Sequence, residues 1–198
     1  MKLQNPSISL RRFSLAYEDL PAFHAAYIML VLVFAGLCNL GFFACLIAAH
    51  VALDFYKYRV HLGYNSLKAF RGVVRGSLID IALLFLAIST FVYLNPSLDS
   101  IRMLNADLQL RVTIMRGLAI LLPKLTILHH SLRIAFDLPS YMQTPHTRIR
   151  KPFGIIEYVS LSTLFIALAL LAVASGVLGL DMTQFGSMLA PELLPWRF

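Results

Sequence analysis

Long runs of apolar residues, separated by shorter polar connections, dominate the pattern along this chain. The first run begins near residue 22 and continues with few interruptions to residue 53, and three more runs follow it. A helix rises about 1.5 Å per residue, so about 20 apolar residues cross the roughly 30 Å hydrocarbon layer of a bilayer. The pattern therefore predicts transmembrane helices rather than the short amphipathic elements of a soluble domain.

We expect an all-α fold, namely a polytopic integral membrane protein built as a four-transmembrane-helix bundle. The transmembrane domain is predicted to cover residues 22–180, with basic connections at 54–76 and 137–154. Within it, the helices are expected at about 22–53, 77–94, 111–136 and 155–180. Small side chains let helices approach closely in lipid. Two stripes of them predict contact between the first and fourth helices: Gly41, Cys45, Ala48 and Ala52, and Ala169, Ala172, Gly176 and Gly179.

The two ends of the chain differ from this apolar centre. Residues 1–21 are predicted to form a polar or amphipathic N-terminal segment. Residues 181–198, with two prolines and the only tryptophan, are predicted to form an interfacial C-terminal tail. Between the ends, each half of the chain contains a long helix ending in histidine, a basic connection and a helix with an early acidic residue. Two repeated helical hairpins are one explanation, and ordinary similarity between membrane hairpins is the other.

Composition supports the membrane prediction and limits the alternatives. Of the 198 residues, 59% are hydrophobic and only 14% are charged, which is too little charge for the surface of a soluble domain. The formal net charge of +7 would favour nucleic-acid binding in a soluble protein. Here the basic residues cluster beside apolar runs and no nucleic-acid-binding motif is present, so we expect no nucleic-acid partner.

The distribution of lysine and arginine predicts orientation. The two long connections and their flanks hold nine such residues: Lys57, Arg59, Lys68, Arg71, Arg75, Arg133, Arg148, Arg150 and Lys151. The opposite side holds six: Lys2, Arg11, Arg12, Arg102, Arg111 and Arg197. The positive-inside rule then places both long connections in the cytoplasm and both termini on the opposite side. The same connections are expected to contact anionic lipids.

Titratable residues gather at the ends of the predicted helices that face these basic connections. His50 and Asp54 are four residues apart, so they share one face of a helix. The up-and-down topology brings the starts of the second and fourth helices to the same level. The adjacent histidines His129 and His130, near the end of the third helix, lie at that level too. The expected layer therefore comprises His50, Asp54, Asp80, His129, His130 and Glu157.

Imidazole and carboxylate groups are ligands of zinc, iron and manganese, and helical bundles build metal sites from facing helices. We therefore consider a divalent metal ion held by His50, Asp54, His129 and His130. The alternative is structural. In it His50 and Asp54 hydrogen-bond to each other, while Asp80 and Glu157 benefit from helix dipoles near helix N-termini.

Two of the basic residues in the third predicted helix, Arg116 and Lys124, lie away from its ends. Lys124 follows Pro123 and is expected to pair with Asp80 or Glu157, with Arg116 farther along the same helix. Such groups either fix helix register as a structural ion pair or belong to a proton or solute path.

Three functions follow from these features. The first is a non-catalytic subunit or scaffold of a membrane assembly, present as a homo- or hetero-oligomer. The second is a metal-dependent, membrane-embedded hydrolase that uses His50, Asp54 and His130 to cleave a lipid ester or phosphoester. The third is an ion or solute transporter subunit. The sequence favours the first and leaves the other two open.

Overall fold

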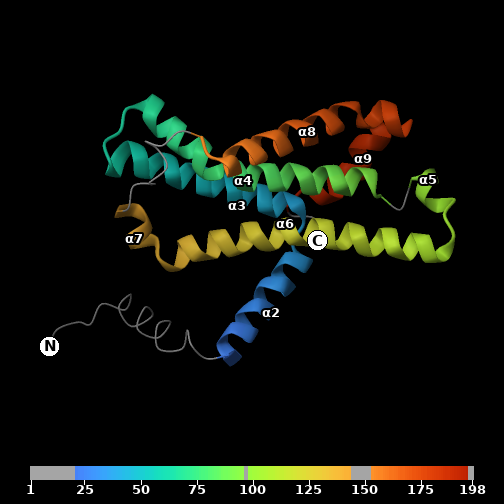
Figure 1. The fold of residues 1–198 in the computed structure, drawn as a ribbon, viewed down its shortest axis with the longest axis horizontal. Helices are drawn as coiled ribbons and strands as arrows, with labels where there is room; N and C mark the ends of the chain where they lie inside the picture. The colour runs from blue at the N-terminus through green and yellow to red at the C-terminus, as the bar shows by residue number, and fades with distance from the viewer. Residues whose placement is uncertain (1–20, 96–97, 144–152, 196–198) are drawn as a thin grey trace.

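The fold was analysed in a computed structural model that describes residues 21–95, 98–143 and 153–195. Every regular element in these ranges is helical (Figure 1). The elements are α2 (Pro21–Leu37), α3 (Leu40–Tyr56), the π-helix η1 (Lys57–His61), α4 (Ser66–Tyr93), α5 (Asp99–Arg102), α6 (Ala106–Phe136), α7 (Leu138–Gln143), α8 (Ile155–Leu178) and α9 (Met182–Leu193). The predicted amphipathic segment at 1–21 lies almost entirely outside the described residues.

Four helices are long and apolar enough to cross a membrane: α3 with η1, α4, α6 and α8. They run along the long axis of the molecule, with η1 and α7 at one end and α5 at the other (Figure 1). The predicted all-α, multi-pass membrane bundle is therefore confirmed. Helices η1 and α7, which lie at the starts of the two basic connections, are at the same end, and the cytoplasmic location of that end stays a prediction.

The first apolar run forms two helices rather than the single helix predicted at 22–53. Helix α2 ends at Leu37 and α3 begins at Leu40, with the break at Cys38 and Asn39. The side chain of Asn39 accepts a hydrogen bond from the backbone N–H of Phe42 at 3.0 Å, so it caps the start of α3. Helix α2 leaves the bundle at an oblique angle beyond this break (Figure 1).

The second and third membrane helices begin earlier than predicted. Helix α4 begins at Ser66 instead of residue 77, and α6 begins at Ala106 instead of residue 111. Asn65 and Asn105 cap these starts by accepting hydrogen bonds from backbone N–H groups three residues on, at 3.1 and 3.0 Å. The connection between α3 and α4 is therefore much shorter than the predicted 54–76.

The hydrophobic core lies mainly between α3, α4 and α6, and α8 packs on α4. Ala167 and Ala174 of α8 are buried, and the Ser89 hydroxyl on α4 donates to the backbone carbonyl of Ala167 at 3.2 Å. The predicted small-residue contact between the first and fourth helices is wrong. Most of its residues are exposed, namely Cys45, Ala48, Ala52, Ala169, Ala172, Gly176 and Gly179.

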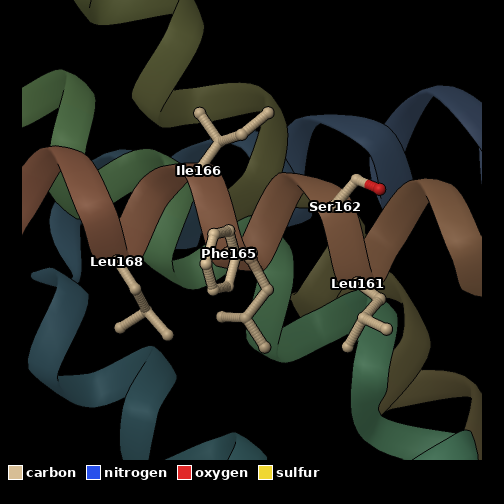
Figure 2. A pocket seen from close by; sticks show the side chains of 6 residues that line it. Leu161, Ser162, Phe165, Ile166 and Leu168 are labelled. Atoms are coloured by element: carbon tan, nitrogen blue, oxygen red, sulfur yellow. The ribbon is translucent and has the colours of Figure 1, made fainter.

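The outer face of α8 is apolar and exposed. Phe165 is 75% exposed, and Leu161, Ile166 and Leu168 lie beside it around a shallow hollow formed by this one helix (Figure 2). Such a face has no favourable contact with water, whereas lipid chains solvate it. We conclude that α8 contacts lipid around Phe165.

The C-terminal segment, predicted as an interfacial tail, contains a helix that folds back toward the start of α3. Helix α9 follows a left-handed turn at Gly179, where φ is +64°. Its end meets the start of α3: the side-chain amide of Asn39 donates to the carbonyl of Leu194 at 2.5 Å. Gly41 lies directly against the backbone of Leu193 and leaves no room for a Cβ. The C-terminal end of α9 is thus packed against the break between α2 and α3.

Candidate metal centre

Three helices bring His50, Asp80 and His130 together inside the bundle. Nδ1 of His130 lies 2.8 Å from Oδ2 of Asp80, and Nδ1 of His50 lies 3.5 Å from the same oxygen. The two imidazole rings meet edge to face, with centroids 4.9 Å apart. One ligand atom from each of the three residues lies within 4.8 Å of the other two. This spacing suits a shared metal ion.

The environment of these three side chains is asymmetric. His50 and Asp80 are buried, whereas the side chain of His130 is 39% exposed. An ion or a small ligand can therefore reach the site past His130, while the rest of the site is closed to solvent. Because bulk water is excluded on the other sides, electrostatic attraction to the Asp80 carboxylate is strong there.

The other edge of the His50 ring faces Asp54 and Tyr141. Nε2 of His50 lies 3.6 Å from Oδ2 of Asp54 and 3.1 Å from the Tyr141 hydroxyl. That hydroxyl donates a short hydrogen bond to Oδ1 of Asp54. Asp54 is fully buried, and its Oδ2 has no hydrogen-bond partner within the described part of the chain. The carboxylate of Asp54 thus serves as the outer partner of His50 rather than facing Asp80.

The π-helix η1 places a cation against this outer shell. It continues α3 and turns Lys57 and Tyr58 inward, so that both are almost completely buried. The ammonium nitrogen of Lys57 lies 3.7 Å from the centroid of the Tyr141 ring. Burial and the hydrogen bond to Asp54 raise the pKa of Tyr141 above its ordinary value, so the phenol remains a proton donor.

The two adjacent histidines of α6 have different roles. Successive residues of a helix point about 100° apart. His130 therefore faces Asp80, whereas Nδ1 of His129 lies 2.9 Å from the hydroxyl of Tyr27 on α2. Of the four predicted metal ligands, the structure brings His50 and His130 together, places Asp54 behind His50 and turns His129 toward α2.

Asp80 and Glu157 also differ from each other. Since α4 begins at Ser66, Asp80 lies fourteen residues, or about 21 Å, inside its helix. The helix-dipole explanation is therefore wrong for Asp80. It fits Glu157, which lies in the first turn of α8 and accepts a hydrogen bond from the backbone N–H of Gly154 at 2.5 Å. Arg75 Nη2 lies 3.1 Å from Glu157 Oε1 in a buried ion pair.

Lys124 lies apart from this cluster. Its ammonium group donates to the backbone carbonyl of Cys38 at 2.8 Å, at the break between α2 and α3. The expected pairing with Asp80 or Glu157 is wrong, because histidines and Arg75 occupy those carboxylates. The guanidinium of Arg116 stacks over the ring of Phe91, with its carbon 4.6 Å from the ring centroid.

Tyr141 was not recognised from the sequence. It lies in a connection of mixed polarity, where no periodic pattern indicates which side chains turn back toward the bundle. The proline at 139 and the adjacent basic residues signalled only a loop. The contact exists because α7 folds the chain back immediately after α6 ends.

Comparison of the chain with protein-family models, with curated proteins and with solved structures yields no match.

Proposed function

We propose that this protein binds one divalent transition-metal ion within its membrane bundle, through Nδ1 of His50, Oδ2 of Asp80 and Nδ1 of His130. The observation that carries the proposal is the convergence of three ligand atoms from three helices within 4.8 Å. Neighbouring ligands of a tetrahedral ion lie about 3.4 Å apart when the metal–ligand bonds are about 2.1 Å. The distances of 2.8 and 3.5 Å around Asp80 need only small adjustments to meet that value.

The donor set indicates which ions would bind. Two imidazoles and one carboxylate suit zinc, iron(II) or manganese(II) better than magnesium or calcium, which prefer sets made of oxygen ligands alone. No thiolate takes part, because Cys38 and Cys45 are free and belong to neither the triad nor its outer partners. A soft ion such as copper(I) is therefore disfavoured.

Asp54 and Tyr141 supply the outer shell that such sites require. A metal-bound imidazole usually donates its second N–H to a carboxylate, which fixes the tautomer and the ring orientation. Nε2 of His50 lies 3.1 Å from the Tyr141 hydroxyl, which in turn donates to Oδ1 of Asp54, so the link from the imidazole to the carboxylate passes through Tyr141. With Nε2–H directed to this side, Nδ1 of His50 keeps a lone pair for the metal.

Three protein ligands leave at least one position open, as in catalytic zinc sites. An ion held there would lower the pKa of bound water and polarise a carbonyl or phosphoryl oxygen. The catalytic form of the proposal is hydrolysis of a lipid ester or phosphoester. Water oxygen bonds to the carbonyl carbon or phosphorus, the ester bond to the alcohol oxygen breaks, and the proton released by water passes to that alcohol.

Metal analysis of the purified protein tests the binding proposal. The protein is loaded with zinc, iron(II) or manganese(II), freed of excess ion and measured by inductively coupled plasma mass spectrometry. We expect about one equivalent of one of these ions. His130→Ala should lose it, whereas His129→Ala, a change of the adjacent residue, should retain it. Less than about a tenth of an equivalent in the native chain, or equal loss in both variants, would contradict the proposal.

A second candidate function is a non-catalytic subunit of a membrane assembly. The observation that favours it is the exposed row of small residues on α8, which includes Ala169, Ala172 and Gly176. Small residues at this spacing allow close approach by another helix. Native mass spectrometry in mild detergent should then reveal an oligomer that Ala172→Leu disrupts. A monomer at all protein concentrations would remove this candidate.

A further inference from the structure

A second buried polar cluster lies halfway along the bundle, away from the metal centre. Lys124 is the nineteenth residue of α6, about 27 Å from the start of this helix and about 18 Å from its end. Its ammonium group meets the Cys38 carbonyl, where α2 ends and α3 is about to begin. A helix break at this depth is uncommon, because backbone groups in hydrocarbon must be satisfied by protein or by a ligand.

The end of α9 completes the surroundings of this break. The Asn39 amide donates to the carbonyl of Leu194, which brings Glu192 to the same place as Lys124. Together they line a cavity of about 540 Å³ whose other walls include Leu37. Leu37 is 72% exposed, so the cavity opens on the apolar outer surface of the bundle. A molecule entering it would come from the lipid rather than from water.

Among the described residues around this cavity, positive charge exceeds negative charge. Lys124 is 6% exposed, and only one of its three N–H donors is used by Cys38. Arg116 lies two helical turns before it, and its Nε is buried without a hydrogen-bond partner in the described ranges. Both cations interact electrostatically with one carboxylate, that of Glu192. Within the described residues one positive charge therefore lacks a counter-ion, in a medium where an uncompensated charge is costly.

We propose that this cavity binds the carboxylate of a long-chain fatty acid. A single negative charge balances this excess, and the carboxylate accepts hydrogen bonds from the donors of Lys124 that the described residues do not use. The acyl chain would leave through the opening beside Leu37 and lie along the exposed apolar face of α2, which includes Val33 and Phe34. A phosphate dianion fits less well, because its second charge would face Glu192 without a partner.

Titration of the purified protein with oleate, followed by native mass spectrometry or calorimetry, tests this site. We expect one equivalent to bind. Methyl oleate has the same chain without the charge and should bind at least about tenfold more weakly, as expected for loss of one charge-assisted hydrogen bond. Acetate, which has the charge without the chain, should also bind at least about tenfold more weakly. Equal affinity for oleate and methyl oleate would overturn the role of the charge, and equal affinity for acetate would overturn the role of the chain.

Two variants separate a binding role from a structural one. Lys124→Met should weaken oleate binding at least about tenfold. Glu192→Gln should strengthen oleate binding, because it removes a negative charge beside the oleate carboxylate. If Glu192 and Lys124 had only a structural role, this substitution would not increase the affinity for oleate. Unchanged or weaker binding in Glu192→Gln would overturn the proposal, even if Lys124→Met does not fold. The metal content of Glu192→Gln should equal that of the native chain, so this test and the metal test can fail independently.

Discussion

The two buried polar clusters of this bundle have opposite electrostatic character. In the first, the carboxylates of Asp54 and Asp80 surround imidazoles, and Lys57 contributes the nearby positive charge. In the second, Lys124 and Arg116 lie within electrostatic range of the Glu192 carboxylate, and no other described carboxylate is assigned to them. Apolar helices enclose both clusters, so neither is stabilised by bulk water. The first cluster is suited to attract a cation, and the second is suited to attract an anion.

They also differ in how the chain builds them. The metal centre is made of side chains that project from the interiors of three continuous helices, so its geometry is fixed by helix packing. The mid-bundle cluster is made around helix ends, where the Cys38 carbonyl and the Asn39 amide take part directly. Side-chain sites of the first kind tolerate changes in a neighbouring loop, whereas sites at helix ends depend on every segment that meets there.

The largest effect on stability is expected at Gly41. A Cβ at this position would lie 2.6 Å from the carbonyl carbon of Leu193, and backbone atoms cannot move away cheaply. Gly41→Ala should lower the free energy of unfolding by about 2 kcal/mol or more, despite the usual helix gain from alanine. Gly36→Ala is the matched control, because no atom lies within 4 Å of its new Cβ. Equal thermal stability of the two variants would show that α9 does not pack against α3.

The next largest effect separates the two aspartates of the metal centre. Asp80→Asn removes the negative charge from the side chain that is proposed to bind the metal directly. It should weaken zinc binding by more than about 100-fold. Asp54→Asn alters only the outer partner of His50 and should weaken it by about 10- to 100-fold. Competition with a chelating dye measures both values. The reverse order would mean that Asp54, as expected from the sequence, is the direct ligand.

The sequence was sufficient for the architecture because the physical signal is strong and local. Long runs of apolar residues with few charges have few alternatives to a transmembrane helix, and such runs were enough to predict four spans. The break at Asn39 was not predicted, because one asparagine in an apolar run resembles a tolerated polar residue. Asn65 and Asn105 cap helices whose first turns are polar. Because hydropathy detects only the apolar part of a helix, it placed the starts of these two helices too late.

The candidate site was predictable only in part. His50 and Asp54 share a helix face, and up-and-down topology correctly brought Asp80 and His130 to the same region. Which of two adjacent histidines faces inward depends on the rotation of α6, which its weak amphipathic pattern leaves open. The exact partners of Lys124 depend on α9 folding back, and no local pattern in residues 182–193 indicates that contact.

A smaller effect is expected at Tyr141, and it depends on pH. Tyr141→Phe keeps the ring beneath Lys57 but removes the hydroxyl that donates to Asp54, which should cost about 1–3 kcal/mol. The folded state raises the pKa of Tyr141. The hydroxyl therefore contributes fully below the ordinary tyrosine pKa of about 10, and its contribution declines above it. The difference in melting temperature between the native chain and the variant should be constant up to about that pH and then shrink. A difference that grows with pH would refute this hydrogen bond.

The smallest effects compare the asparagine caps, and they test whether the mid-bundle break is built differently from an ordinary helix start. Asn105 is exposed and supplies only a cap, so Asn105→Ala should cost about 1 kcal/mol. Asn39 supplies the same cap at 3.0 Å and also donates to the Leu194 carbonyl at the end of α9. Asn39→Ala should therefore cost about 1 kcal/mol more than Asn105→Ala.

Asn39→Asp keeps the oxygen that caps α3 but loses the amide that donates to Leu194, so it should recover only the cost of the cap. If thermal unfolding shows equal losses for Asn39→Ala and Asn105→Ala, the link between Asn39 and α9 contributes nothing to stability, and it does not hold α9 in place as a wall of the cavity beside Lys124.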